Sequence, residues 1–287
     1  MFRTRHPCRG PQSRVHRGGA GTSATSSRPE GLSAAPRAHV DDHFLSSGLR
    51  LACHVAIPDG ARGPLPAVVL CHGFPSGGID ARHSGGTFPE LIDEIATELK
   101  WVGMAFTFRG CATSEGDFSM QGWVDDVRAA ISHVVSIATP AGIWLVGNNS
   151  GGSLALCVAA DDPRVEGCAL LGARADFDDW AAQPRRFLEH AREIGTVRRP
   201  GFPASIEEWS RELRRFRPTD AARRYAPRPL LLMHGADDHV VPPADSRVIA
   251  QAHGSAELHV IPGAGHRLRH DPRAMAMLFG WLARQRP

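Results

Sequence analysis

Short apolar runs of strand length alternate with longer segments of helical periodicity through most of this chain. The runs hold apolar residues at successive positions, which is typical of strands covered on both faces; they span 66–73, 104–110, 142–147, 165–172, 229–235 and 256–263. The helical segments span 88–103, 120–138, 150–161, 243–254 and 271–285. Because parallel strands need helical crossovers, this alternation predicts an α/β fold, a mainly parallel sheet with helices on both faces.

The first segment of the chain differs from the rest in composition. Residues 1–40 are rich in Arg, Ser, Gly and Pro and have almost no apolar periodicity, so they cannot bury enough surface to offset chain entropy. We expect a disordered basic tail there; its composition also resembles an organellar transit peptide, and a translated upstream region is a further alternative. Order is expected over 41–287, beginning with two strands around a Ser-Gly turn within 41–58.

Charge is unevenly distributed and gives no support to nucleic-acid binding. The 287 residues carry a formal net charge of +3, but residues 1–40 hold seven arginines and one acid, Glu30, which leaves about −3 for residues 41–287. No run approaches the roughly 18 apolar residues that a membrane span needs, so we expect no membrane partner. The six cysteines form no CxxC pair and no metal-ligand spacing, and a reducing cytoplasm is the expected setting.

An insertion at 173–228 interrupts the alternation between two predicted strands. Its roughly 55 residues are too many for a connecting loop in a compact domain, and its amphipathic segments predict helices punctuated by prolines. We therefore predict a small helical cap over the carboxyl edge of the sheet, where open α/β folds bind ligands. Trp180, Phe187, Trp209 and Phe216 would either roof an apolar pocket or pack the cap onto the domain.

Four short motifs follow predicted strands in a fixed order. They are HGFPSG at 72–77, GNNSGG at 147–152, HGADDHVVP at 234–242 and GAGH at 263–266. In this order they resemble the oxyanion loop, nucleophile turn, acid and histidine of the α/β-hydrolase fold, over about residues 40–286. The chain is thus similar to a superfamily that includes serine esterases and peptidases, which implies a small ester or amide as substrate.

The resemblance implies a role for one residue in each motif. The backbone N–H groups of Phe74 and Ser150 would be the two oxyanion donors. Asp238 would be the acid that holds His266, the general base, in one tautomer and orientation. From the residues alone, Asp238 could instead cap a turn, and His266 could be an exposed loop histidine. The order of the four motifs favours the catalytic positions.

The turn at 147–152 holds asparagine where the family pattern G-x-nucleophile-x-G has its nucleophile. Counting from Gly147 to Gly151 places Asn149 at the apex. An amide has no acidic hydroxyl or thiol proton for a histidine to remove, so Asn149 is not a useful nucleophile. Asparagine nevertheless suits a strained apex, because it tolerates positive φ better than most residues. We therefore expect the turn to be kept and the nucleophile to be missing.

Other routes to a nucleophile remain open at this point. Ser150 offers a nearby hydroxyl, but at the first helical position its side chain is expected to point away from the apex and to help cap the helix. Deamidation of Asn149 would give an aspartate, which some relatives in this fold, the epoxide hydrolases and haloalkane dehalogenases, use as nucleophile. Cys111 is a third candidate, but it lies far from the turn in the sequence pattern.

Two functions of different classes fit these residues. The first is a hydrolase-like protein for a small ester or amide, with weak or absent serine-hydrolase activity. The second is a non-catalytic protein of this fold that binds a small ligand or a protein partner. Retention of Asp238 and His266 favours the first, and Asn149 favours the second. No Walker loop, HExxH or dinucleotide fingerprint is present, so no cofactor and no metal are expected, and the oligomeric state is left open.

Overall fold

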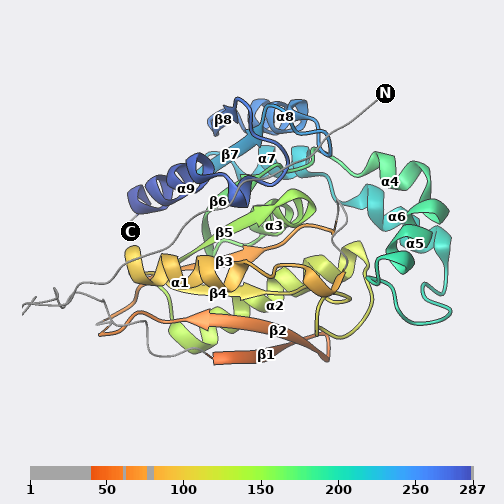
Figure 1. Ribbon diagram of the computed structural model, residues 1–287, viewed down its shortest axis with the longest axis horizontal. Coiled ribbons are helices and arrows are strands. Elements are labelled where there is room, and N and C mark those ends of the chain that lie inside the picture. Colours follow the sequence, from red (N-terminus) through yellow and green to blue (C-terminus); the bar gives the residue numbers. More distant parts are fainter. Residues whose placement is uncertain (1–39, 61–62, 76–80, 286–287) are drawn as a thin grey trace, which may run out of the picture. The chain divides into compact units, whose positions relative to one another are not determined.

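The computed structural model describes residues 40–60, 63–75 and 81–285. The segment predicted to be a disordered tail, 1–40, lies outside these residues except for Val40. Within the described ranges, eight strands form one sheet in the order β1-β2-β4-β3-β5-β6-β7-β8 (Figure 1). The sheet is parallel from β4 to β8, and β2 runs antiparallel to both β1 and β4. The predicted fold class is therefore confirmed.

The predicted strands are all present, with bounds that differ by a few residues. The strands are β1 (Val40–Ser46), β2 (Leu49–Ala56), β3 (Pro66–Cys71), β4 (Val102–Phe106), β5 (Gly142–Asn148), β6 (Val165–Leu171), β7 (Leu230–Gly235) and β8 (Glu257–Ile261). The first two form the predicted hairpin. Its two turn residues, Ser47 and Gly48, have φ of 50° and 79°, as a tight two-residue hairpin loop requires.

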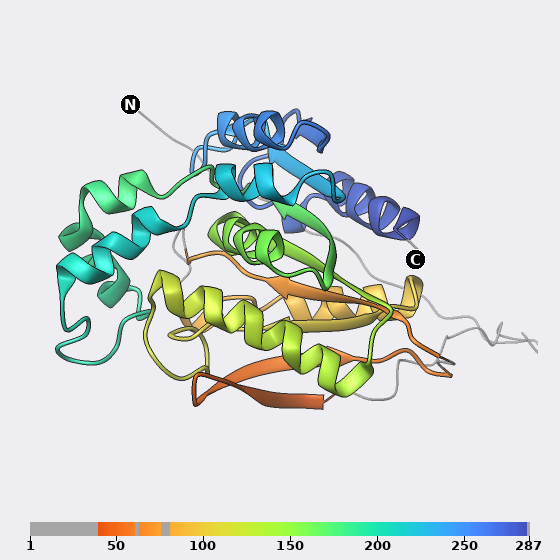
Figure 2. The ribbon, with the colours of Figure 1, turned by 180° about the vertical axis from the view of Figure 1, so that it is seen from behind.

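Helices cover both faces of the sheet (Figures 1 and 2). One face carries α1 (Phe88–Glu98) and α9 (Pro272–Arg284), and the other carries α2 (Met120–Ala138), α3 (Asn149–Asp161) and α8 (Pro243–His253). Successive strand residues point to opposite faces, so Val69 lies in one core cluster and Val68 and Leu70 lie in the other. The central strands are thus buried on both faces, which explains their continuous apolar sequences.

Three short helices between β6 and β7 form a cap at one end of the sheet (Figure 1): α4 (Asp178–Ala182), α5 (Pro184–Glu193) and α6 (Ile206–Arg215). Their aromatic rings stack, with the centroid of Phe187 lying 4.3 Å from that of Trp180 and 5.5 Å from that of Trp209. Phe187 also contacts Phe74, in the loop after β3, at 5.1 Å. These rings therefore pack the cap onto the domain, one of the two roles that the sequence allowed.

The last helix of the predicted insertion, α7 (Pro218–Tyr225), lies outside the cap. It packs against α3 and α8 in the helical layer of the sheet and buries Ala221, Ala222 and Tyr225. The predicted cap boundary at residue 228 was therefore too late. Alanines allow close helix packing but contribute little to an apolar pattern, so α7 resembles the cap helices before it in sequence.

The chain changes its direction of travel across the sheet at β3, because β4 pairs with one edge of β3 and β5 with the other. In open α/β sheets, ligands bind outside the carboxyl ends of the strands at such a switch point. The loop after β3 contains Phe74, and the turn after β5 contains Asn149. The topology therefore brings two of the four sequence motifs together.

Candidate active site

The turn between β5 and α3 holds Asn149 at its apex with a φ of 47°. This is the left-handed region, which asparagine enters at lower cost than most residues. Glycines allow the surrounding backbone to approach closely. A Cβ on Gly151 would lie 1.9 Å from the carbonyl oxygen of His72, and a Cβ on Gly147 would lie 2.4 Å from the Cα of Gly152. The shape of the turn therefore depends on its glycines rather than on the residue at the apex.

Asn149, His266 and Asp238 form a hydrogen-bonded line across the ends of β5, β7 and β8. The Asn149 amide Nδ2 lies 3.2 Å from His266 Nε2, and His266 Nδ1 lies 2.8 Å from Asp238 Oδ2. A carboxylate can only accept, so Nδ1 carries the imidazole proton and donates it to Asp238. The lone pair of Nε2 then accepts the Asn149 N–H. The base and acid positions are thus arranged as in a catalytic triad, with an amide where a hydroxyl would stand.

Asp238 is held as a carboxylate by donors on both oxygens. Its Oδ1 accepts the backbone N–H groups of Val240 and Val241 at 2.8 and 2.9 Å, and its Oδ2 accepts from His266 and lies 3.3 Å from Nε2 of His234. Burial raises the pKa of this carboxyl, but the surrounding donors outweigh burial and hold the pKa well below its usual range. Asp238 therefore stays charged at neutral pH and can orient His266.

His234 is a residue of this network that the sequence analysis did not identify. It is completely buried at the end of β7, where its Nε2–H donates to the Val241 carbonyl at 2.9 Å and its Nδ1 accepts from the Ser246 hydroxyl at 2.6 Å. These bonds place Nε2 beside the carboxylate of Asp238. The sequence shows only that His234 lies in a buried strand, four positions before the acid; its partners are visible only in the fold.

Ser150 makes a contact that differs from the sequence prediction. Its Oγ accepts the backbone N–H of Phe74 at 2.8 Å, so the side chain turns toward the loop after β3. It does not cap α3, whose N-cap is Asn148 and which has no side-chain cap bond. The prediction that Ser150 helps cap the helix is therefore wrong. The reason is a long-range partner, because the N–H of Phe74 needs an acceptor and Ser150 supplies one.

Cys111 does not have the ionisation expected of a nucleophile. It is completely buried, and burial raises the pKa of its thiol to about 12. The thiolate, which is the reactive form, is therefore scarce at neutral pH. Cys53, Cys71, Cys157 and Cys168 are buried as well, as their apolar sequence surroundings predicted.

A cavity of about 210 Å³ opens beside Asn149 and His266. It lies between the loop after β3, the start of α1 and the segment that follows His266. Its lining consists of His72, Gly73, Phe74, Pro75, His83, Ser84, Gly85, Gly86, Thr87, Phe88, Asn148, Asn149, Leu171, His266, Arg267, Arg269 and His270. The cavity is the space in which a molecule could meet the hydrogen-bonded line described above.

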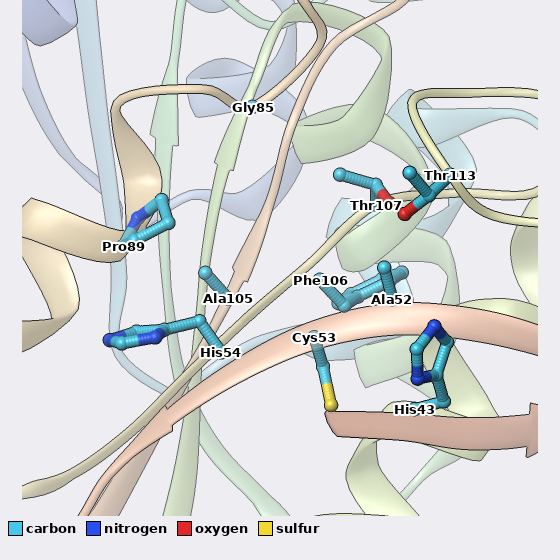
Figure 3. A pocket seen from close by; sticks show the side chains of 10 residues that line it. All are labelled: His43, Ala52, Cys53, His54, Gly85, Pro89, Ala105, Phe106, Thr107 and Thr113. Carbon is cyan, nitrogen blue, oxygen red and sulfur yellow. The ribbon is translucent and has the colours of Figure 1, made fainter. Parts of the chain in front are cut away.

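A second cavity, of about 290 Å³, lies over β2 and β4 and is separate from this line of residues (Figure 3). Figure 3 shows His43, Cys53 and His54 along the two strands of the hairpin, with Thr107 and Thr113 on the opposite wall. None of Asn149, Asp238 and His266 lines it.

In the described ranges, no group of three or more His, Cys, Asp or Glu side chains is placed to hold a metal ion. No helix of that part of the chain is long and apolar enough to cross a membrane.

Comparison with known proteins shows that this chain is similar to hydrolases. The model of the alpha/beta hydrolase family matches residues 68–278. A 2-hydroxymuconate semialdehyde hydrolase of Pseudomonas putida is 28% identical over 277 residues, covering 84% of this chain and 93% of the relative. A pimeloyl-[acyl-carrier protein] methyl ester esterase of Xanthomonas oryzae pv. oryzae is 30% identical over 244 residues, covering 70% and 88%.

A solved structure has the same fold at lower sequence identity. Est1E from Butyrivibrio proteoclasticus with ferulic acid bound superimposes with a TM-score of 0.64 at 18% identity, covering 84% of this chain and 96% of that one.

Proposed function

Because this chain belongs to the alpha/beta hydrolase family, we propose that it binds a small ester- or amide-type molecule beside Asn149 and His266 and hydrolyses it weakly or not at all. Asp238 and His266 would act as the acid and general base of the family. The backbone N–H groups of Phe74 and Ser150 would be the oxyanion donors. The two relatives are named a semialdehyde hydrolase and a methyl ester esterase, which supports a small carbonyl compound as the molecule bound.

One observation carries the proposal: the Asn149 amide donates to His266 Nε2 at 3.2 Å. This nitrogen is the atom that would take a proton from a nucleophile, and here an amide that cannot give one up occupies it. Without a covalent step, water activated by His266 is the remaining route. By analogy with triad knockouts, binding and oxyanion stabilisation would then leave about 10³–10⁴-fold acceleration over water.

The test compares hydrolysis of p-nitrophenyl acetate by the wild type, Asn149→Ser and Asn149→Ser/His266→Ala. We expect a wild type close to background, a gain of at least about a hundredfold in Asn149→Ser, and loss of that gain in the double variant. Peptide mass spectrometry of residue 149 excludes an aspartate formed by deamidation. Turnover as fast as that of Asn149→Ser, by a wild type whose residue 149 is still asparagine, would contradict the proposal and make Ser150 the next residue to change.

A non-catalytic binding protein is the second candidate, and the contact of Ser150 Oγ with the Phe74 N–H favours it. The Phe74 N–H, one of the two oxyanion donors, and the His266 Nε2 of the base are then both hydrogen-bonded to groups of the protein itself. Native mass spectrometry of the purified chain tests this alternative. A co-purifying small molecule combined with an inactive Asn149→Ser variant would support binding over hydrolysis.

A further inference from the structure

His234 is a completely buried polar residue on a strand whose other side chains are apolar. Leu231, Leu232 and Met233 precede it on β7 and are completely buried as well. A buried imidazole has to satisfy both of its ring nitrogens, which a leucine in the same space would not need to do. Packing alone therefore does not account for a histidine at this position.

Both ring nitrogens of His234 are used, and their two bonds fix the ring. The Val241 carbonyl can only accept, so Nε2 carries the proton and donates it over 2.9 Å. Nδ1 then accepts the hydroxyl of Ser246, in the first turn of α8, at 2.6 Å. Because Ser246 is also completely buried, water does not compete for this bond. The loop after β7 and the helix α8 thus hold His234 in one tautomer and orientation.

The fixed Nε2–H of His234 lies beside the carboxylate of Asp238. Nε2 is 3.3 Å from Oδ2, the oxygen that also accepts from His266 Nδ1 at 2.8 Å. The Asp238 side chain is completely buried, and of the described residues only His234 and His266 lie within ion-pair distance of it. Burial raises the pKa of Asp238, and the contact with His234 is the largest of the interactions that lower it again.

His234 also closes the loop that carries the acid. Val241 donates its N–H to Asp238 Oδ1 at 2.9 Å and receives the His234 N–H on its carbonyl. Both oxygens of Asp238 are therefore connected to the end of β7, Oδ1 through Val241 and Oδ2 by its closeness to Nε2. Since a misplacement of 1 Å can cost about 10²-fold in rate, the position of this loop matters for a histidine that depends on Asp238.

We propose that His234 is a positioning residue, which holds Asp238 in the orientation that keeps the proton of His266 on Nδ1. The inference rests on the proposed function for the roles of Asp238 and His266 and adds the residue that supports them. Ser246 belongs to the same arrangement, because its hydroxyl keeps the His234 proton on Nε2. His234 does not line the candidate active-site cavity, so it acts through Asp238.

Nitrogen-15 NMR of the His266 ring tests this role without any need for hydrolysis. The parent protein is Asn149→Gly, which suits the positive φ and removes the amide that otherwise also holds Nε2. At a pH where His266 is neutral, its tautomer then depends on Asp238. In His234→Leu we expect the ratio of the Nδ1–H to the Nε2–H tautomer to fall at least tenfold. In His234→Gln, whose amide N–H can replace the Nε2–H donor, the ratio should stay close to that of the parent.

His253→Leu is the matched control, since His253 is also buried and bonds through Nε2 to the Arg228 carbonyl rather than to the acid. A merely structural role of His234 would lower stability in His234→Leu without changing the tautomer of His266. An unchanged ratio in His234→Leu, or an equal fall in the control, would overturn the proposal. If His234→Leu does not fold, Ser246→Ala decides: the His234 proton can then move to Nδ1, so the ratio should again fall, and an unchanged ratio is equally fatal.

Kinetics in the Asn149→Ser background provide a second measurement. Adding His234→Leu should lower kcat for p-nitrophenyl acetate at least about tenfold with little change in KM, because Asp238 orients the base and does not bind substrate. The two proposals fail separately. An inactive Asn149→Ser variant contradicts the proposed function but leaves the NMR comparison unaffected. An unchanged His266 tautomer contradicts the role of His234 but not a gain of esterase activity in Asn149→Ser.

Discussion

At the apex of the turn, the Asn149 amide donates a hydrogen bond to its neighbour His266, but the amide oxygen of Asn149 has no hydrogen-bond partner. This oxygen is buried, and the φ of Asn149, 47°, lies in the left-handed region. In Asn149→Ser the amide that donates to His266 Nε2 is absent, so this nitrogen is free to accept another proton donor. The close glycine contacts around the turn do not involve the removed atoms.

The Ser150 hydroxyl is expected to compete with substrate for the Phe74 N–H. In an Asn149→Ser background, Ser150→Ala should therefore raise kcat for p-nitrophenyl acetate by about tenfold or more, since one oxyanion donor is worth roughly 10²–10³ in kcat. Steady-state kinetics of the two variants make the comparison. Ser153→Ala, in the next turn of α3, serves as the control and should bring no such gain. A lower kcat in the Ser150→Ala variant would show that its hydroxyl assists catalysis.

His72 is expected to make stability depend on pH. Its Nδ1–H donates to the Gly73 carbonyl and its Nε2 accepts the Phe108 N–H, so it is folded in the neutral form. Burial lowers its pKa to about 4, although the bond to Gly73 opposes this. Between this value and the unfolded value of about 6.5, the unfolded chain binds more protons, so the free energy of unfolding falls as pH decreases.

The contribution of His72 should amount to about 2 kcal/mol between pH 7 and pH 5. Urea unfolding at both pH values measures it. In His72→Gln the loss of stability between pH 7 and pH 5 should be smaller by this amount, whereas His239→Gln, at an exposed histidine, should behave as the wild type. An equal loss in His72→Gln and the wild type would mean that His72 is protonated in the folded state.

Among the elements, the cap depends on its aromatic stack. Phe187→Ala removes the ring that contacts Trp180, Trp209 and Phe74, and a buried Phe→Ala change costs about 3–5 kcal/mol. We expect faster amide hydrogen exchange in α5 and α6, with the amides of the sheet unchanged. Phe279→Ala, on α9, is the control and should leave the cap unaffected. Faster exchange throughout the sheet would show that the cap and the sheet unfold as one unit.

Whether a helix or strand could be predicted from the sequence depends on which of its faces are buried and by which residues. Strands such as β3 and β5 are covered on both faces and appear as unbroken apolar runs. The placement of α7 could not be predicted, because its contacts with α3 and α8 are made largely by small residues.

The candidate site was predictable where a motif fixes local geometry, as at the apex of the turn and at His266. The partners of Ser150 and His234 lie in other elements, and sequence spacing does not reveal such contacts. These contacts of Ser150 and His234 can be identified only in the folded structure.

At the scale of the whole molecule, the sheet joins two core clusters into one structure. Leu145 of β5 is completely buried in the cluster that includes α2 and α3, while its neighbours Trp144 and Val146 belong to the opposite cluster. A loss of packing at this strand should therefore affect both faces.

Leu145→Ala is expected to lower the free energy of unfolding by about 2–5 kcal/mol. Urea unfolding followed by far-UV circular dichroism and by tryptophan fluorescence should shift equally with both probes. Leu45→Ala, at a residue 67% exposed, is the control and should change stability by less than about 0.5 kcal/mol. Separate transitions for the two probes would contradict a single cooperative unit.

The glycines of the turn affect how easily the residue at its apex can change in evolution. Because Gly147, Gly151 and Gly152 hold the backbone, the apex residue can be exchanged while the turn keeps its shape. Codons for asparagine and serine differ by a single base, so one point mutation separates this chain from a complete Ser-His-Asp set. Under the proposed function, covalent chemistry at residue 149 would thus be lost or regained without any change in the domain around it.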